Sequence, residues 1–382
     1  MKSKYVWLIL AGLVALFAVV SCKTTPPAET ESTPTQEAAT PAPAPAPTPA
    51  PAPAQNVPTS PTQADLDALN AAAARAAAAR TLVSDFNGST LFPQDWQSAD
   101  SLYSQADQQK DNSTQSATQD STARYNKAAD ALEALASKTL AQSYDTMEKQ
   151  ITDARDAAVN AGAGDLVPDM LLQADNTTAD ALAKYQAKDY YGARDAANSA
   201  LSMYGILTDG IAAYNVRMEI ANRGFETYDS DNIAAADDTL RSAADDYSAK
   251  NLPSAKAKVD KAAQSYKQSL QTCWHSFATE KGANAGAERQ NALNLKANVA
   301  VKDDFNSAQT VYTNADTAFQ ANKFEDAANL YQQSQSMFAA VSQAASAKQQ
   351  AAQDALQRAN QKMTESDETA RKAELILQGG AQ

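Results

Sequence analysis

A stripe of small and apolar residues that recurs four times constrains the fold of this 382-residue chain more than any other feature. Each stripe advances by steps of 3, 4, 3 and 4 residues, which places its side chains on one face of an α-helix. The stripes begin at Tyr125, Tyr190, Leu252 and Phe324 and end at Thr139, Tyr204, Tyr266 and Phe338. We expect the three aromatic residues that end them to be buried between helices.

A shorter helical stripe precedes each of these. In the last three copies it ends in an aromatic residue, Tyr185, Tyr247 or Phe319, five residues before the next stripe begins, whereas Lys110 takes that place in the first copy. A polar insertion near residues 112–121 lengthens the first turn. The copies recur at intervals of roughly 65 residues, so we predict an all-α region of four repeats, each a short helix and a long one. The copies lie near 64–140, 141–204, 205–266 and 267–382.

Short polar segments between the paired stripes predict turns. These segments contain Lys188 and Asp189 in the second copy, Asn251 in the third and Asn322 in the fourth. Proline stands before or at the start of the short helix in two copies, a position that tolerates it because no helical hydrogen bond is lost there.

The length of the second helix in each copy decides between two architectures. If Tyr190–Tyr228, Pro253–Lys281 and Phe324–Leu377 are continuous helices, the repeats form an elongated rod of three-helix segments that share helices. If each long helix breaks, helical hairpins stack side by side as a solenoid. Glycine is rare and proline nearly absent in these stretches, which favours the rod. Tyr190–Tyr228, with four glycines, is the long helix that breaks most readily.

The N-terminus has the pattern of a bacterial lipoprotein signal. Two lysines within Met1–Lys4 precede the apolar run Tyr5–Val20, and small residues stand before Cys22. We predict a signal peptide over 1–21 and a lipid on Cys22, with an uncleaved anchor helix as the alternative. The linker over 22–63 holds most of the chain's prolines and is typical of an extended spacer. Lys23 in place of an aspartate favours the outer membrane under the sorting rule of enteric bacteria.

The net charge and the two cysteines limit the kinds of molecule that this protein is expected to bind. A net charge of −13 argues against nucleic acid, which clustered lysine and arginine bind. With Cys22 as the lipid site, Cys273 has no partner within the chain and is expected to be a buried thiol, although an intermolecular disulfide stays open. We therefore expect anchoring to a membrane through the N-terminal lipid and an envelope protein partner of unknown identity, and the C-terminal helix or Cys273 offers a route to an oligomer.

Residues suited to catalysis are sparse. His275 is the one histidine and lies on a predicted helix, so we expect a packing role. The segment Asp229–Asn232 lacks the glycine and the later acidic residue of a calcium loop, and no Cys/His cluster has the spacing of a zinc site. We expect neither an enzyme nor a cofactor.

The short helix of the third copy is strongly acidic, with Glu226, Asp229, Asp231, Asp237, Asp238, Asp245 and Asp246 in or near it. These side chains either dock a basic partner or pair with Lys250, Lys256, Lys258 and Lys261 of the next helix. The second interpretation is favoured, because exposed helix pairs of this kind are common and individually weak.

Two segments resemble known repeats. Ala315–Ser334 and Ala181–Leu201 are similar to the core of a tetratricopeptide repeat, although the period here is much longer than the period of that family. Ala154–Met170, continuing through Tyr190, and Phe92–Ala99 resemble a helical domain of unknown function in spirochaete-type envelope lipoproteins. That resemblance implies an all-α body held in the bacterial envelope, either periplasmic or surface-exposed.

From these features we predict a lipid-anchored helical-repeat scaffold or spacer of the cell envelope that mediates protein–protein interaction. The alternative is a receptor lipoprotein that binds a peptide, a protein or a small ligand at a site not visible in the sequence.

Overall fold

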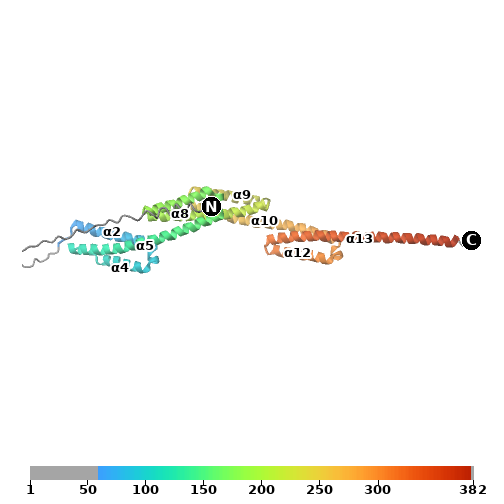
Figure 1. Cartoon of the computed structure of the whole chain (residues 1–382), viewed down its shortest axis with the longest axis horizontal. Coiled ribbons are helices and arrows are strands. Elements are labelled where there is room, and N and C mark those ends of the chain that lie inside the picture. The colour runs from blue at the N-terminus through green and yellow to red at the C-terminus, as the bar shows by residue number, and fades with distance from the viewer. Residues whose placement is uncertain (1–58, 380–382) are drawn as a thin grey trace, which may run out of the picture. The chain divides into compact units, whose positions relative to one another are not determined.

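The computed structural model describes residues 59–379, which lie within one compact unit that begins at Pro58. The prediction for Cys22 and its linker lies outside these residues. The described residues form twelve α-helices and one short 3₁₀ helix, η2, with no strand among them, so the predicted all-α class is confirmed. The helices follow one another in an elongated arrangement (Figure 1).

Three-helix bundles are the building units of this arrangement, and in the first, second and fourth a four-residue helix joins the first and second members. The first bundle contains α2 (Gln63–Asp85), α4 (Pro93–Gln108) and the first half of α5 (Gln115–Ala161), with α3 (Gly88–Leu91) as the joining helix. The second bundle contains the rest of α5, α7 (Pro168–Gln186) and the first half of α8 (Tyr190–Asn222), joined by α6 (Ala163–Leu166).

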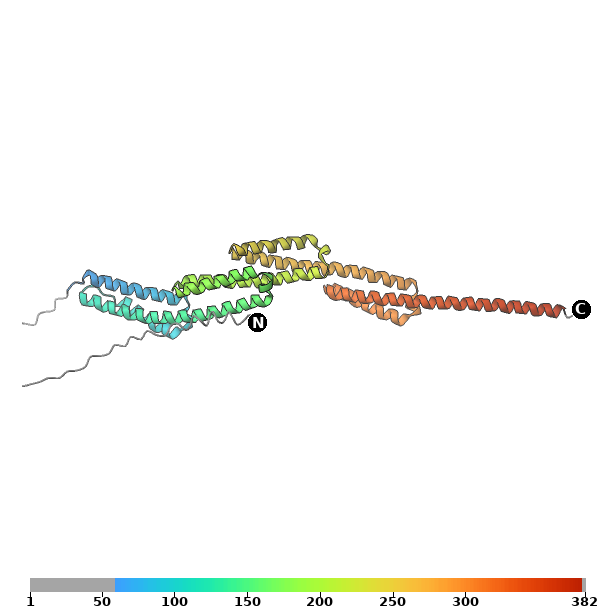
Figure 2. The same ribbon diagram turned by 45° about the horizontal axis from the view of Figure 1, so that its top comes forward.

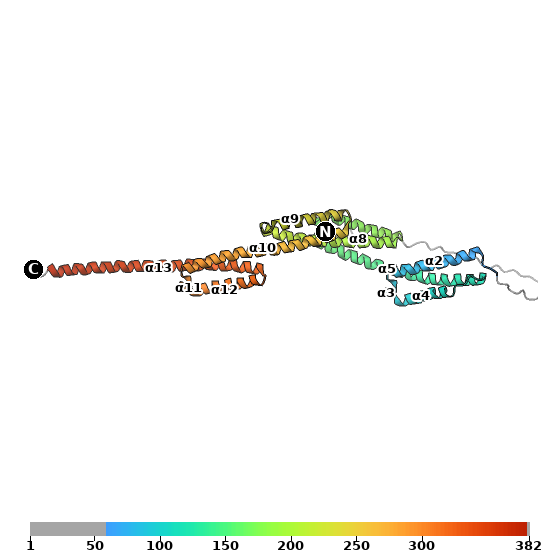
Figure 3. The ribbon, with the colours of Figure 1, turned by 180° about the vertical axis from the view of Figure 1, so that it is seen from behind.

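The third and fourth bundles repeat this plan. The third contains the rest of α8, then η2 (Glu226–Tyr228), α9 (Ser230–Ser248) and the first half of α10 (Leu252–Asn294). The fourth contains the rest of α10, then α11 (Ala297–Ala300), α12 (Lys302–Gln320) and the first half of α13 (Phe324–Gly379). Figures 2 and 3 show the same succession from two other sides.

The long helices are continuous where the solenoid alternative required each of them to break in two. α5, α8 and α10 each pack with earlier helices through their first half and with later helices through their second half. Gly192, Gly205 and Gly210 lie inside α8 without interrupting it. Two predicted boundaries were wrong: α8 ends at Asn222 rather than Tyr228, and α10 continues to Asn294 rather than Lys281.

The early end of α8 has a local cause. Gly224 adopts a φ of 70°, a left-handed conformation that glycine tolerates and that ends a helix. A similar residue follows the first helix of every bundle: Asn87, Gly162, Gly224 and Lys296 all have positive φ. The polar insertion of the first copy is also shorter than expected, because Thr114 caps α5 and Gln115 already belongs to that helix.

The turns before the long helices confirm the sequence prediction. Lys188, Lys250 and Asn322 have φ values of 62°, 60° and 59°, and each stands two residues before a long helix. Pro93 and Pro168 begin α4 and α7, where the missing N–H removes no helical hydrogen bond.

The aromatic ends of the repeated stripes form the core of their bundles. Tyr204, Tyr266 and Phe338 are at most 1% exposed, as predicted. Around them pack mainly alanines, which allow the helices to approach closely, and this explains why a chain with few large apolar residues folds into stable bundles.

Candidate functional site

The residues that the sequence singled out for chemistry have packing roles. Cys273 is buried; its thiol donates a hydrogen bond to the Phe225 carbonyl at 3.4 Å, and burial raises its pKa to about 11. A thiol that stays protonated at neutral pH is a poor nucleophile. His275 packs against the rings of Phe319 and Phe324, at centroid distances of 5.2 and 4.9 Å. Residues 59–379 contain no cluster suited to a metal ion.

The acidic residues of the third bundle pair mainly within the protein. Asp246 accepts a hydrogen bond from Lys258 at 2.6 Å across the hairpin, and this contact lowers the pKa of the Asp246 carboxyl. Asp237 and Glu226 both contact Arg217. Lys256 does not follow the expectation: it pairs with Asp260 of its own helix and with Asp209 of α8. The prediction of pairing across the hairpin is therefore confirmed for Lys258 and wrong for Lys256, and among the described residues no carboxylate pairs with Lys250 or Lys261.

An arginine on the first helix of each bundle bonds to the second helix, a feature that the sequence analysis missed. Arg155 Nε donates to Asp175 at 2.8 Å, and Arg217 Nε donates to Asp237 at 3.0 Å. The tyrosine at the end of the repeated stripe completes each cluster, since Tyr204 and Tyr266 both donate to these aspartates at 2.6 Å. The constant spacing from arginine to aspartate was present in the sequence, but many other arginine–aspartate spacings are present too, and nothing in the sequence distinguishes this one.

The outer bundles keep the arginine; the first also keeps the aspartate and lacks the tyrosine, and the fourth lacks both. Arg80 bonds to Asp100, but Thr139 stands where the second bundle has Tyr204, and its buried hydroxyl has no hydrogen-bond partner among the described residues. Arg289 bonds to Gln309, and Phe338 replaces the tyrosine. In the fourth bundle, where Phe338 has no hydroxyl to donate, the neutral amide of Gln309 stands in place of the carboxylate. These clusters hold the bundles together and offer no open site.

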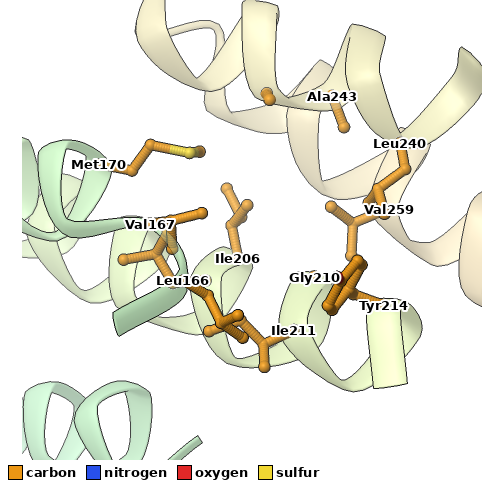
Figure 4. A pocket seen from close by; sticks show the side chains of 12 residues that line it. Leu166, Val167, Met170, Ile206, Gly210, Ile211, Tyr214, Leu240, Ala243 and Val259 are labelled. Carbon is orange, nitrogen blue, oxygen red and sulfur yellow. The ribbon is translucent and has the colours of Figure 1, made fainter. Parts of the chain in front are cut away.

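Between the second and third bundles lies an apolar pocket of about 300 Å³. Its floor is buried and consists of Ile206, Leu207, Ile211, Ala243 and Val259. Leu166 and Tyr214 form its edge and are 47% and 39% exposed. Figure 4 shows Val167 and Met170 facing Ala243, Leu240 and Val259 across the space, with Ile206 and Ile211 from α8 between them.

The pocket exists because these two bundles meet closely. Tyr204 and Arg217, which mark the cores of the second and third bundles, are close together on α8, whereas Tyr266 and Arg289 are much farther apart on α10. At about 1.5 Å per residue, the bundle cores are roughly 20 Å and 35 Å apart along the two helices. Across the shorter spacing, Tyr247 of α9 donates to the Met170 carbonyl of α7 at 2.9 Å.

Gly210 lines the pocket without a side chain. A methyl group there would stand 3.8 Å from Val259 Cγ2, an ordinary contact distance, so the space beside α8 is unfilled rather than crowded. The only polar side-chain atom lining the pocket is the Tyr214 hydroxyl, since the other eleven lining residues are aliphatic, glycine or methionine. Such a surface suits a hydrocarbon chain and has no group to orient a charged ligand.

The second half of α13 is a different kind of candidate surface. Every residue over 346–377 is exposed, Leu356, Met363 and Leu377 among them at 64–76%. In Figures 1, 2 and 3 this half extends beyond the fourth bundle with no other helix beside it. No helix in the described part of the chain is long and apolar enough to cross a membrane.

Comparison with known proteins adds one distant similarity. No protein-family model matches the chain, and no solved structure matches it. Over 227 residues the chain is 22% identical to treponemal membrane protein A of Treponema pallidum (strain Nichols). The match covers 59% of this chain and 66% of that protein. The chain is thus similar to a spirochaete membrane protein, and the resemblance to tetratricopeptide repeats has no support from a family model.

Proposed function

We propose that this protein is a lipid-anchored scaffold or spacer of the bacterial cell envelope, which holds a protein partner at a distance from the membrane. The observation that carries the proposal is the continuity of α5, α8 and α10 through two bundles each. A helix shared by two bundles cannot kink sharply at their junction without losing hydrogen bonds, so it limits how far one bundle moves against the next. This continuity supports a protein whose function is to span a distance and to present surfaces to a partner.

The cellular location of the protein is proposed from the sequence and from the comparison with known proteins together. The lipoprotein signal pattern that ends at Cys22 and the similarity to a treponemal membrane protein both support attachment to a membrane. Lys23 favours the outer membrane, with the body in the periplasm or on the cell surface. The proposal assigns no catalytic step and no cofactor to the protein.

Membrane fractionation with labelled fatty acid tests the anchor. The wild-type chain is expected to incorporate the label and to sediment with outer-membrane density. Cys22→Ala is expected to lose the label and either to be released or to remain as an uncut precursor. Cys273→Ala is the matched control, because it removes the other cysteine and is expected to keep both label and location. Label on the Cys22→Ala protein would contradict the proposal.

Affinity purification of the lipidated chain from its native envelope, after crosslinking in intact cells, tests the scaffold role. A protein crosslinked to the body of the chain and lost when residues 59–379 are deleted is the expected result. Recovery of lipids alone, with no protein crosslinked to the bundles, would contradict it.

The apolar pocket supports a second candidate function, the binding of a small ligand. We propose a hydrocarbon chain as its ligand, because the lining is apolar and the volume is that of a small organic group rather than a peptide. A dansylated fatty acid is the probe, and saturable fluorescence enhancement is expected.

Two alanines of α9 provide the variant and its control. Ala244→Leu fills the pocket and is expected to weaken binding at least about five-fold, since the added side chain takes the place of ligand carbons. Ala235→Leu adds the same side chain at an exposed position outside the pocket and is expected to bind as the wild type does. Equal binding by both variants would exclude the pocket as the site.

A further inference from the structure

The second half of α13 has no helices packed against it among the described residues, unlike the second halves of the other long helices. The second halves of α5, α8 and α10 are each covered by the next short helix and the next long helix, and their small residues are buried there. In α13 the same half is fully exposed over 346–377. At about 1.5 Å per residue, this is roughly 48 Å of helix that no other described helix covers, and Lys348, which donates to the Ala300 carbonyl at 2.7 Å, lies at its start.

An isolated helix of this length in water draws little stability from its own hydrogen bonds, because helices in proteins are held mainly by packing of one face. The exposed half of α13 has such a face. A stripe with alternating steps of three and four residues runs through it for four heptads; we name it the terminal stripe. It consists of Gln349, Ala352, Leu356, Ala359, Met363, Ser366, Ala370, Ala373 and Leu377.

Large apolar residues and small residues occupy different positions along the terminal stripe. In heptad terms, the large residues Leu356, Met363 and Leu377 are all at a positions, which also include Gln349 and Ala370. The d positions, from Ala352 to Ala373, hold only alanine or serine. Small d residues let two helices approach closely, and the larger a residues then fill the space between them. An a/d pattern of this kind sustained over four heptads is typical of a coiled coil.

The charges beside the stripe indicate how two copies pair. Lys348 and Lys362 are at g positions, and Asp367 and Glu374 are at e positions. In a parallel pair, the g residue of one helix faces the e residue of the next heptad on its partner, so Lys362 faces Asp367 twice by symmetry. An antiparallel pair places g beside g and e beside e, which brings lysines together and carboxylates together.

We propose that this protein self-associates through a parallel, in-register two-stranded coiled coil formed by residues 349–377 of two copies. The pair buries the leucine and methionine side chains of the terminal stripe and gives the last long helix the packing that its three counterparts receive from the following bundle. Two helical arrays are thereby joined at their C-terminal ends. This inference does not depend on the lipid anchor or on the pocket, so its test is separate from theirs.

Cysteine crosslinking of the full chain tests both the pairing and its direction. In a Cys273→Ser background, Ala352→Cys and Ser366→Cys each place a thiol at a d position, where parallel in-register helices bring the two copies together. Both variants are expected to form a covalent dimer on mild oxidation. Gln361→Cys, on the opposite face of the same helix, is the matched control and is expected to stay monomeric on a non-reducing gel.

Each other outcome contradicts the proposal. Dimer formation at only one of the two d positions indicates an antiparallel or shifted pair, and formation at neither indicates that a different partner covers the stripe. All three positions are exposed, so loss of crosslinking does not result from misfolding of the bundles. Circular dichroism of each variant confirms this.

A charge exchange tests the register independently. Asp367→Lys places lysine opposite Lys362 of the partner and is expected to weaken dimerisation about five-fold in sedimentation equilibrium, because two attractive contacts become repulsive. Lys362→Asp combined with Asp367→Lys restores opposite charges and is expected to recover the wild-type affinity. A double variant as weak as the single one would overturn the assigned pairing.

Discussion

Arg155 and Asp175 are 20 residues apart in the chain and joined by two hydrogen bonds, from Nε at 2.8 Å and from Nη2 at 3.0 Å. The same interval separates Arg217 from Asp237, Arg80 from Asp100 and Arg289 from Gln309. Each pair joins the first helix of a bundle to the second, across the joining segment. The interval is fixed because the turn between these helices has one length, and length differences between copies two to four are confined to the long helices.

Truncation of Tyr204 tests the importance of the aromatic core. Tyr204→Ala is expected to cost about 3 kcal/mol of stability, since it removes a fully buried ring, as large-to-small core changes do. Tyr204→Phe keeps the ring and removes only the hydroxyl, with its hydrogen bonds to Asp175 and Thr178, so a loss of about 1 kcal/mol is expected. Urea denaturation monitored by circular dichroism measures both. Equal losses in the two variants would show that the hydroxyl, not the packing, stabilises the second bundle.

The fourth bundle allows the cluster to be rebuilt. Phe338→Tyr together with Gln309→Asp recreates, beside Arg289, the arrangement of Asp237 and Tyr266 beside Arg217. We expect the two changes to be coupled by about 0.5–1.5 kcal/mol, because the new hydroxyl donates to the new carboxylate. A double-mutant cycle read by hydrogen exchange in α12 and α13 gives the coupling, and strict additivity would mean that the side chains do not meet.

High pH is expected to unfold the middle bundles. Burial, together with hydrogen bonds to Asp175 and Asp237, raises the pKa of Tyr204 and Tyr266 above the ordinary value. Because the folded-state pKa lies above the unfolded value of about 10, the stability that these phenols contribute is fully present below about pH 10 and is lost as pH rises beyond it. Tyrosinate absorbance and helical circular dichroism are expected to change together above that pH. Ionisation of all tyrosines without loss of helix would refute this.

Small-angle scattering tests the continuity of the long helices. For a chain beginning at Pro58, the maximum dimension is expected to exceed about 84 Å, because α13 alone has 56 residues at about 1.5 Å each. The concentration must be low enough to populate the monomer. A maximum dimension shorter than a straight α13 would mean that the long helices bend or break in solution.

The helices, their order and the residues at their centre could be predicted from local periodicity. The alternating stripe that ends at Tyr204, Tyr266 and Phe338 identified the buried face directly, because helical periodicity fixes which side chains share a face. The short polar segments between the stripes identified the turns that Lys188, Lys250 and Asn322 form. The end of α8 was missed because the single residue Gly224 stops a helix whose pattern otherwise continues. The end of α10 was missed because the helix continues through Gly282 and Gly286.

The contacts between helices, and the space that remains between them, depend on tertiary packing. The bonds from Arg155 and Arg217 to the facing helix form where two helices of one bundle pack together, and the pocket beside Gly210 results from how far one bundle stands from the next. That distance is set by the number of helical residues between Tyr204 and Arg217. Local periodicity repeats unchanged along such a helix, so it carries no information about where the next bundle begins. The place of contact emerges only when side chains from separate helices pack together.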